Sequence, residues 1–287
     1  MELRRRFIFR GNAAAIGGRI VRPTDLILDS IATSSLTVVG GRSRERAAAA
    51  KFGEWISFGE ANTFAEGLFD DVQRQIDFTN GKVPEDYLST STRVSADVVN
   101  LVVGTRPRLT IKHLHAALNS KSPTGSGEPP IAVGADSVIE GVAVDGHELT
   151  IELNMAPFQK YDTLSKLMTA SDDPAFVKDS GAQLYMTPTT APGAAAPPPP
   201  GPPRVRYCNG IVQATVVKSI TWAADPIANS KIDQNSVYVP ELGRIFFGEL
   251  LISDLSRRFT LLRLELGSEL GGAVACAEVE TNGSWST

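Results

Sequence analysis

The residues best suited to chemistry are two histidines separated by one position, His113 and His115. In a β-strand both imidazoles would project from the same face, where they could hold zinc or iron. In a helix, residues two apart diverge, and Ile111, Leu114 and Leu118 fit a helical stripe with His115 at least as well. No third ligand is apparent nearby. His113 and His115 are therefore the candidate metal ligands, and no catalytic residue is assigned.

The other reactive residues form no recognised catalytic or cofactor motif. Glu278 and Glu280 would project from one face of a terminal strand, where we expect a solvated surface rather than calcium binding or acid–base chemistry. The glycine-rich stretch 267–272 follows a predicted strand but lacks the lysine and the serine or threonine of a phosphate-binding loop. His147 is expected to be exposed beside a turn. We therefore expect no cofactor and favour a non-catalytic protein, although an enzyme stays an open alternative.

Two tryptophans are candidates for a binding surface. Trp222 ends a predicted strand, and Trp285 lies in the C-terminal tail 281–287. Indole rings are rarely left in water, so a tail tryptophan is expected to dock on its own sheet or, alternatively, on a neighbouring subunit.

Short strands are predicted along most of the chain. Their expected positions are 3–10, 19–22, 35–39, 55–58, 92–103, 205–208, 211–222, 237–239, 244–252, 257–266 and 273–280. The clearest element is a hairpin over 137–153, because Asp145-Gly146 is a favoured turn pair. One face of this hairpin would carry Val138, Val142, Val144, Leu149, Ile151 and Leu153.

Two segments have helical patterns. Thr63 and Glu66 match a capping box, and an apolar residue follows at every fourth position through Phe64, Leu68, Val72 and Ile76. The second predicted helix covers 157–170, with an apolar stripe through Tyr161, Leu164, Leu167 and Met168.

A run of proline, alanine and glycine at 188–203 divides the chain. It has no charge and no large apolar side chain, so we expect an extended spacer outside the core. The predicted organisation is a β-rich region with one or two helices at 1–187, this spacer, and a second β-rich region at 204–287. The second region is able to complete the sheets of the first.

Composition limits the choice of partners. The 287 residues carry a formal net charge of −4, which does not suit a nucleic-acid partner. No apolar run is long enough for a transmembrane segment, and the apolar stretch after Arg4–Arg6 is too short for a signal peptide, so we expect a soluble, cytoplasmic protein. Cys208 and Cys276 are expected to be buried thiols, with one disulfide as the alternative.

The fold expected is mainly β, with antiparallel sheets in a sandwich- or barrel-like arrangement, one or two helices and a Pro-rich insertion; α+β is the alternative. The favoured function is a non-catalytic binding or assembly protein that acts through β-sheet surfaces or edges, with a protein partner or self-association. Two alternatives stay open. One is a metal-dependent hydrolase using His113 and His115, with acids such as Asp70 or Glu280, and the other is an oligomerising membrane-active β protein.

Overall fold

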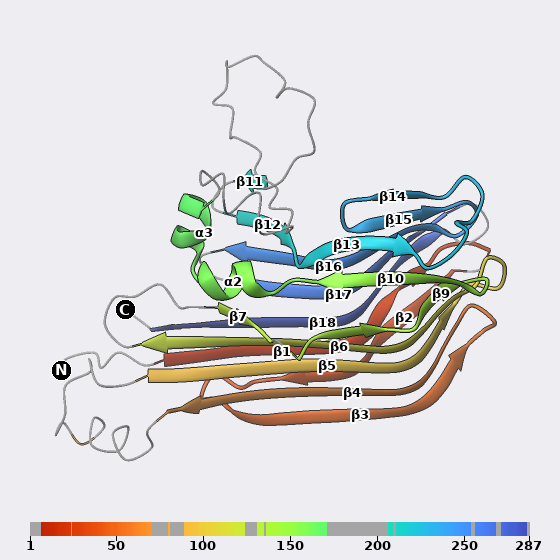
Figure 1. Cartoon of the computed structure of the whole chain (residues 1–287). Helices are drawn as coiled ribbons and strands as arrows, with labels where there is room; N and C mark the ends of the chain where they lie inside the picture. The colour runs from red at the N-terminus through yellow and green to blue at the C-terminus, as the bar shows by residue number, and fades with distance from the viewer. Residues whose placement is uncertain are drawn as a thin grey trace, which may run out of the picture.

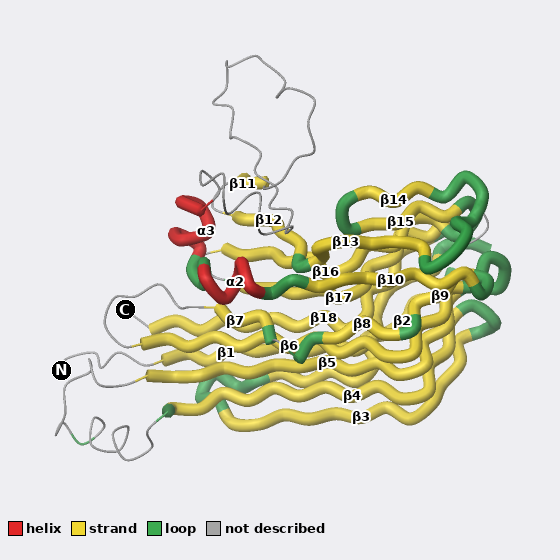
Figure 2. Tube along the Cα trace, viewed as in Figure 1, coloured by secondary structure: helices red, strands yellow, loops and turns green. Residues whose placement is uncertain are grey.

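Two antiparallel sheets of long strands, stacked face to face, make up the structure (Figure 1). The computed structural model describes residues 7–23, 25–70, 80, 89–123, 131–134, 136–170, 206–208, 211–253, 256–267 and 271–285. Strand dominates this part of the chain (Figure 2), which confirms the predicted mainly β class. The Pro-rich run 188–203 lies outside the described residues.

The first sheet combines strands from the two ends of the described chain. Its strands in spatial order are β11 (Arg206–Cys208), β12 (Ile211–Thr215), β16 (Gly243–Ser253), β17 (Arg257–Leu266), β18 (Gly272–Trp285), β1 (Phe7–Ile20) and β2 (Leu26–Ser35). A short hairpin of β14 (Lys231–Asp233) and β15 (Ser236–Val239) pairs beside β16. The predicted strands at 244–252 and 257–266 are present as β16 and β17, inside this sheet.

The second sheet is built mainly from the middle of the chain. Its strands in spatial order are β13 (Val217–Trp222), β10 (His147–Leu153), β9 (Val142–Val144), β6 (Leu109–Pro123), β5 (Ser89–Val103), β4 (Ile56–Phe69) and β3 (Gly41–Phe52), with β7 (Ile131–Val133) and β8 (Val138–Glu140) beside β6. Strands from before and after residues 188–203 therefore share both sheets. The predicted hairpin is present as β9 and β10, and Asp145 and Gly146 both have positive φ, as its turn requires.

Small residues allow the two sheets to approach closely. A methyl group on Gly11 would lie 2.9 Å from Leu36 Cδ1, and one on Gly67 would lie 2.6 Å from Phe9 Cδ1. The buried hydroxyls of Ser34 on β2 and Thr63 on β4 bond to each other across the interface at 2.8 Å. The core is thus packed too tightly for larger side chains at these positions.

A transverse row of positions at which the β pairing is interrupted, with the same register on both sides, crosses each sheet. In the first sheet the row contains Gly248, Leu261, Ala277, Ala15 and Ala32, and in the second it contains Ala49, Gly59, Asn100, Lys112 and Gly141. Each ladder loses the pair at this level, and φ is positive at Gly248, Ala277, Ala32, Asn100 and Gly141. The long strands bend together toward one end of the molecule (Figure 1).

The helix predicted to begin at Thr63 is wrong, because this segment belongs to β4. Thr63 and Ala65 alternate with more exposed neighbours, and the Thr63 hydroxyl bonds to Ser34 rather than to a helix start. Val72 and Ile76 lie outside the described residues. The second predicted helix is present as two short helices, α2 (Ala156–Lys160) and α3 (Leu164–Ala170).

Candidate functional site

The borders of the two sheets differ in how much of their backbone stays available. β12 passes into β13 through Val216 and so connects the first sheet to the second, while β11 is only three residues long. β2 forms a third border, where the Thr33 amide donates to Glu45 Oε2 of β3 at 2.6 Å. The fourth border is β3, twelve residues long and the longest of the border strands described.

The edge of β3 contains no proline, and no described strand pairs with it on its outer side. Within the described residues, Gly41–Lys51 makes its backbone ladder with β4 and with no other strand. In Figure 1, β3 lies at the lower border of the second sheet with no described element beyond it. A strand in this position offers a row of unpaired N–H and C=O groups to an incoming chain.

Three alternating arginines line the outer face of β3. Arg42 pairs with Glu66 and Arg46 with Glu60, whereas the Arg44 guanidinium lies 5.4 Å from the centre of the Phe64 ring. All three arginines are exposed. Four small residues, 47–50, follow them. The edge therefore combines accessible backbone with a row of positive charge.

His113 and His115 lie on β6, a strand, with Asp97 of β5 beside them. His115 Nδ1 donates to Asp97 Oδ1 at 2.8 Å, and His113 Nε2 lies 3.4 Å from the same oxygen. The second ring nitrogen of His115, Nε2, lies 3.4 Å from Asp136 Oδ2. The described residues contain no group of three or more acidic, histidine or cysteine side chains placed to hold a metal ion.

The contact between His115 and Asp97 changes the pKa of both side chains. The hydrogen bond to Asp97 raises the pKa of His115, against the opposing effect of burial. Burial by itself would raise the pKa of Asp97, but the hydrogen bonds and charges of His115 and His113 outweigh it and lower that pKa. The arrangement therefore favours a protonated His115 beside ionised Asp97, with both imidazole nitrogens facing carboxylates.

The remaining candidate residues lie apart from this cluster. The half-buried Trp222 ring meets the His147 ring edge-on, with centroids 6.3 Å apart, and His147 Nδ1 lies 3.0 Å from the Asp225 carbonyl oxygen. Trp285 is paired with Phe7 at the end of β18, so its backbone belongs to the sheet rather than to a free tail. Trp222 and His147 therefore contact each other away from His113 and His115, and the Trp285 side chain lies outside the described part.

Acidic and thiol side chains on β18 have structural partners or are buried. Glu278 accepts from Thr260 at 3.0 Å, and Glu280 accepts from Ser256. Cys276 is a free, fully buried thiol, and burial raises its pKa to about 12. The Cys208 side chain lies outside the described part.

The sequence contained a signal for the β3 edge that pattern reasoning missed. Arginine alternates with other residues from Arg42 to Arg46, a period of two that is typical of a strand. The four alanines that follow favour helix by intrinsic propensity and obscure this pattern. No strand was predicted between 39 and 55 for that reason.

One family model matches this chain. Its description is Domain of unknown function (DUF8256), and it matches residues 7–253. No curated protein and no solved structure matches the chain. Among the described helices, none has the length and apolar character needed to span a membrane.

Proposed function

The chain belongs to the DUF8256 family, and we propose that it is a non-catalytic binding protein that captures an extended segment of a protein partner on the free edge of β3. The observation that carries this proposal is the long, uncovered backbone edge. An added strand would gain main-chain hydrogen bonds along Gly41–Ala48, and its alternate side chains would face the outer and inner surfaces of the sheet.

The partner segment is expected to be acidic. Arg42, Arg44 and Arg46 project from one face of the edge at alternate positions, so carboxylates at every second position of an incoming strand would lie opposite them. Arg44 is the central arginine and contacts an aromatic ring rather than a carboxylate among the described residues. It is therefore the most available charge for the partner.

The same arginines disfavour pairing between two copies of this chain. Every two-fold antiparallel register centred between Arg42 and Arg46 places two arginine side chains opposite each other. Registers centred beyond residue 47 would have to cross Ala49, where the pairing of β3 with β4 is interrupted. A partner of different sequence is thus favoured over self-association.

The geometry around His115 supports a binding role over the metal-dependent hydrolase. A metal ligand or a general base needs a free lone pair on an imidazole nitrogen. Both ring nitrogens of His115 face carboxylates, at 2.8 Å and 3.4 Å, and the neighbouring His113 is directed at the same Asp97 oxygen. This arrangement favours the protonated imidazole, which has no lone pair for a metal ion or a substrate proton.

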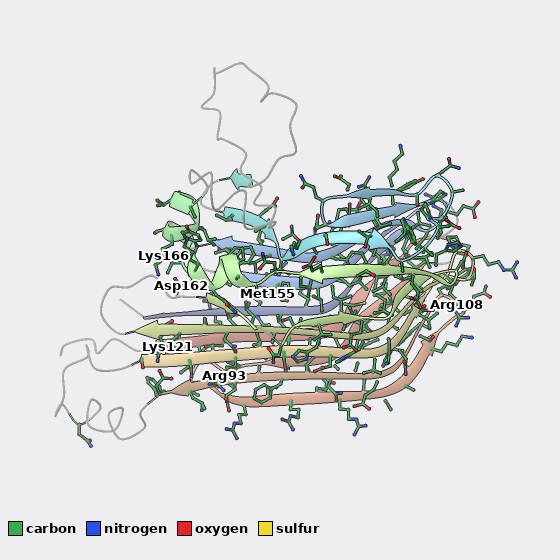
Figure 3. All side chains as sticks on the ribbon, viewed as in Figure 1. Arg93, Arg108, Lys121, Met155, Asp162 and Lys166 are labelled. Atoms are coloured by element: carbon green, nitrogen blue, oxygen red, sulfur yellow. The ribbon has the colours of Figure 1, made fainter. Side chains whose placement is uncertain are left out.

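A labelled peptide of alternating threonine and glutamate tests the proposal by fluorescence anisotropy. We expect saturable binding, none for the matching threonine–lysine peptide, and a loss of affinity of about tenfold or more in Arg44→Glu because attraction becomes repulsion. The matched control is Arg108→Glu. Arg93 of β5 lies opposite Glu66, the partner of Arg42, and so marks the level of the β3 arginines; Arg108 is exposed at the opposite end of the molecule from it (Figure 3). It should bind the peptide normally.

Hydrogen exchange locates the bound peptide. We expect added protection of the backbone amides of 41–48 and no comparable change on β2. Binding without protection on β3, equal losses in both variants, or no saturable binding would each overturn the proposal. Light scattering should give the mass of a monomer, and a dimer that dissociates in Arg44→Glu would identify a second copy as the partner instead.

A further inference from the structure

A groove crosses the outer face of the second sheet beside the two helices. It has a volume of about 580 Å³, and its floor is formed by β5 and β6 while Gln159 and Asp162 contribute from the helical segment. Figure 3 shows Arg93 and Lys121 on these strands, with Asp162 nearby and Arg108 far away at the other end. The volume falls within the range of sites for small ligands.

Two of the three carboxylates that line the groove pair with a lysine, and the third lies near a histidine. Asp70 lies 3.1 Å from Lys121 Nζ, Asp136 lies 3.4 Å from His115, and Asp162 lies 2.7 Å from Lys166 Nζ. Asp70 and Asp162 are therefore each paired with a lysine, while Asp136 shares His115 with Asp97.

Arg93 is the exception to this pairing. Its exposed side chain makes no ion pair with any described residue. The acidic residue opposite it in register is Glu66, whose carboxylate accepts from Arg42 instead. Arg93 is thus a cationic side chain of the groove without a carboxylate partner among the described residues.

Neutral hydrogen-bonding groups surround Arg93. Ser91 and Ser95 lie two positions away on the same strand, and Asn119 is opposite on β6. Ala117, opposite Ser95, is small and leaves room beside the guanidinium. The floor therefore presents a charged fork with hydroxyl and amide groups around it.

We propose that this groove is an anion-binding site in which Arg93 recognises a carboxylate or phosphate group of a small polar ligand. A guanidinium can donate two parallel hydrogen bonds to either group, and the adjacent hydroxyls and amide add further donors. This site adjoins the outer face of β3, because Phe64 lines the groove and contacts Arg44, but it does not use the β3 backbone edge and does not rest on the proposed function. A ligand could therefore occupy the groove while β3 stays free.

Titration with citrate and, separately, with inorganic phosphate tests the site at low ionic strength. Isothermal calorimetry measures affinity, and amide chemical shifts in an NMR spectrum of labelled protein locate the anion. We expect saturable binding of at least one anion with shifts confined to 91–95 and 117–121. Citrate binding alone would identify carboxylate as the ligand group, and phosphate binding alone would identify a phosphoryl group.

Variants at Arg93 decide whether the binding is specific. Arg93→Gln should weaken binding about tenfold or more, and Arg93→Lys should restore only part of it because a lysine lacks the planar fork. Arg108→Gln, with the same loss of charge elsewhere, should bind normally. No saturable binding of either anion, unchanged affinity in Arg93→Gln, or equal weakening in Arg108→Gln would overturn the proposal. Arg44→Gln, which removes the charge of the β3 edge without adding a negative one, should weaken anion binding much less than Arg93→Gln does.

Discussion

The hydroxyl pair of Ser34 and Thr63 links the two sheets through the dry interior, and it allows a quantitative test of their packing. Both residues are almost fully buried, with 1% and 2% of their surface exposed, and their oxygens are 2.8 Å apart. Ser34→Ala leaves the Thr63 hydroxyl buried without this partner. An unsatisfied buried polar group costs about 1–3 kcal/mol.

The double variant should lose less unfolding free energy than either single variant. Ser34→Ala with Thr63→Val replaces the pair by apolar groups of similar shape, which is close to neutral. We therefore expect each single variant to lose about 1.5 kcal/mol of unfolding free energy and the double variant about 0.5 kcal/mol. For a chain of this size, the single losses correspond to a fall in Tm of roughly 3–6 °C.

Urea unfolding followed by tryptophan fluorescence measures these free energies. Ser35→Ala is the matched control, because Ser35 is exposed and its hydroxyl bonds to Asn12 at the surface. This control should change stability by less than about 0.5 kcal/mol. Additive losses in the double variant, within about 0.5 kcal/mol, would refute the inferred coupling across the sheets.

Three other properties follow from the structure. Since the pKa of His115 is raised, protonated His115 stabilises the fold fully below its ordinary pKa of 6.5, and this stabilisation is lost as pH rises through the pKa of the folded state. The urea midpoints of wild type and His115→Gln should therefore converge with rising pH. A gap between the two midpoints that does not change with pH would contradict the raised pKa. The lowered pKa of Asp97 acts oppositely, so its contribution, present above pH 3.8, should disappear as acid protonates it, and an Asp97→Asn variant as acid-sensitive as wild type would argue against the pair. Cys276 should react with a thiol reagent only after unfolding because burial raises its pKa to about 12, and rapid labelling of native protein would be inconsistent with its burial. 

The rows of interrupted pairing explain why the prediction of strands from the sequence was incomplete. On β6, Ile111 and Leu114 are both buried although they are three residues apart, because the strand changes phase at Lys112. That spacing resembles a helical stripe, which is why helix and strand were equally plausible around His113. The sequence alone does not locate such a change in the alternation of buried and exposed residues. The change depends on neighbouring strands whose pairing is interrupted at the same level.

The candidate sites, too, are visible in the sequence only in part. The alternation of Arg42, Arg44 and Arg46 is visible in the sequence, but whether a strand is internal or at a border depends on which strands pair. The contacts of Asp70 with Lys121 and of Asp136 with His115 join residues far apart in the chain, and so does the Arg42–Glu66 pair that leaves Arg93 without a carboxylate partner among the described residues. Neither site could have been assigned from local patterns.

The sequence by itself determined the mainly β class and the hairpin at Asp145-Gly146, because these follow from side-chain alternation and from turn residues that tolerate positive φ. Only the tertiary structure decided that segments on both sides of residues 188–203 share two sheets and that Thr63 belongs to a strand. The physical reason is that antiparallel pairing satisfies backbone groups between distant segments, and the energy of that pairing and of core burial exceeds local propensity.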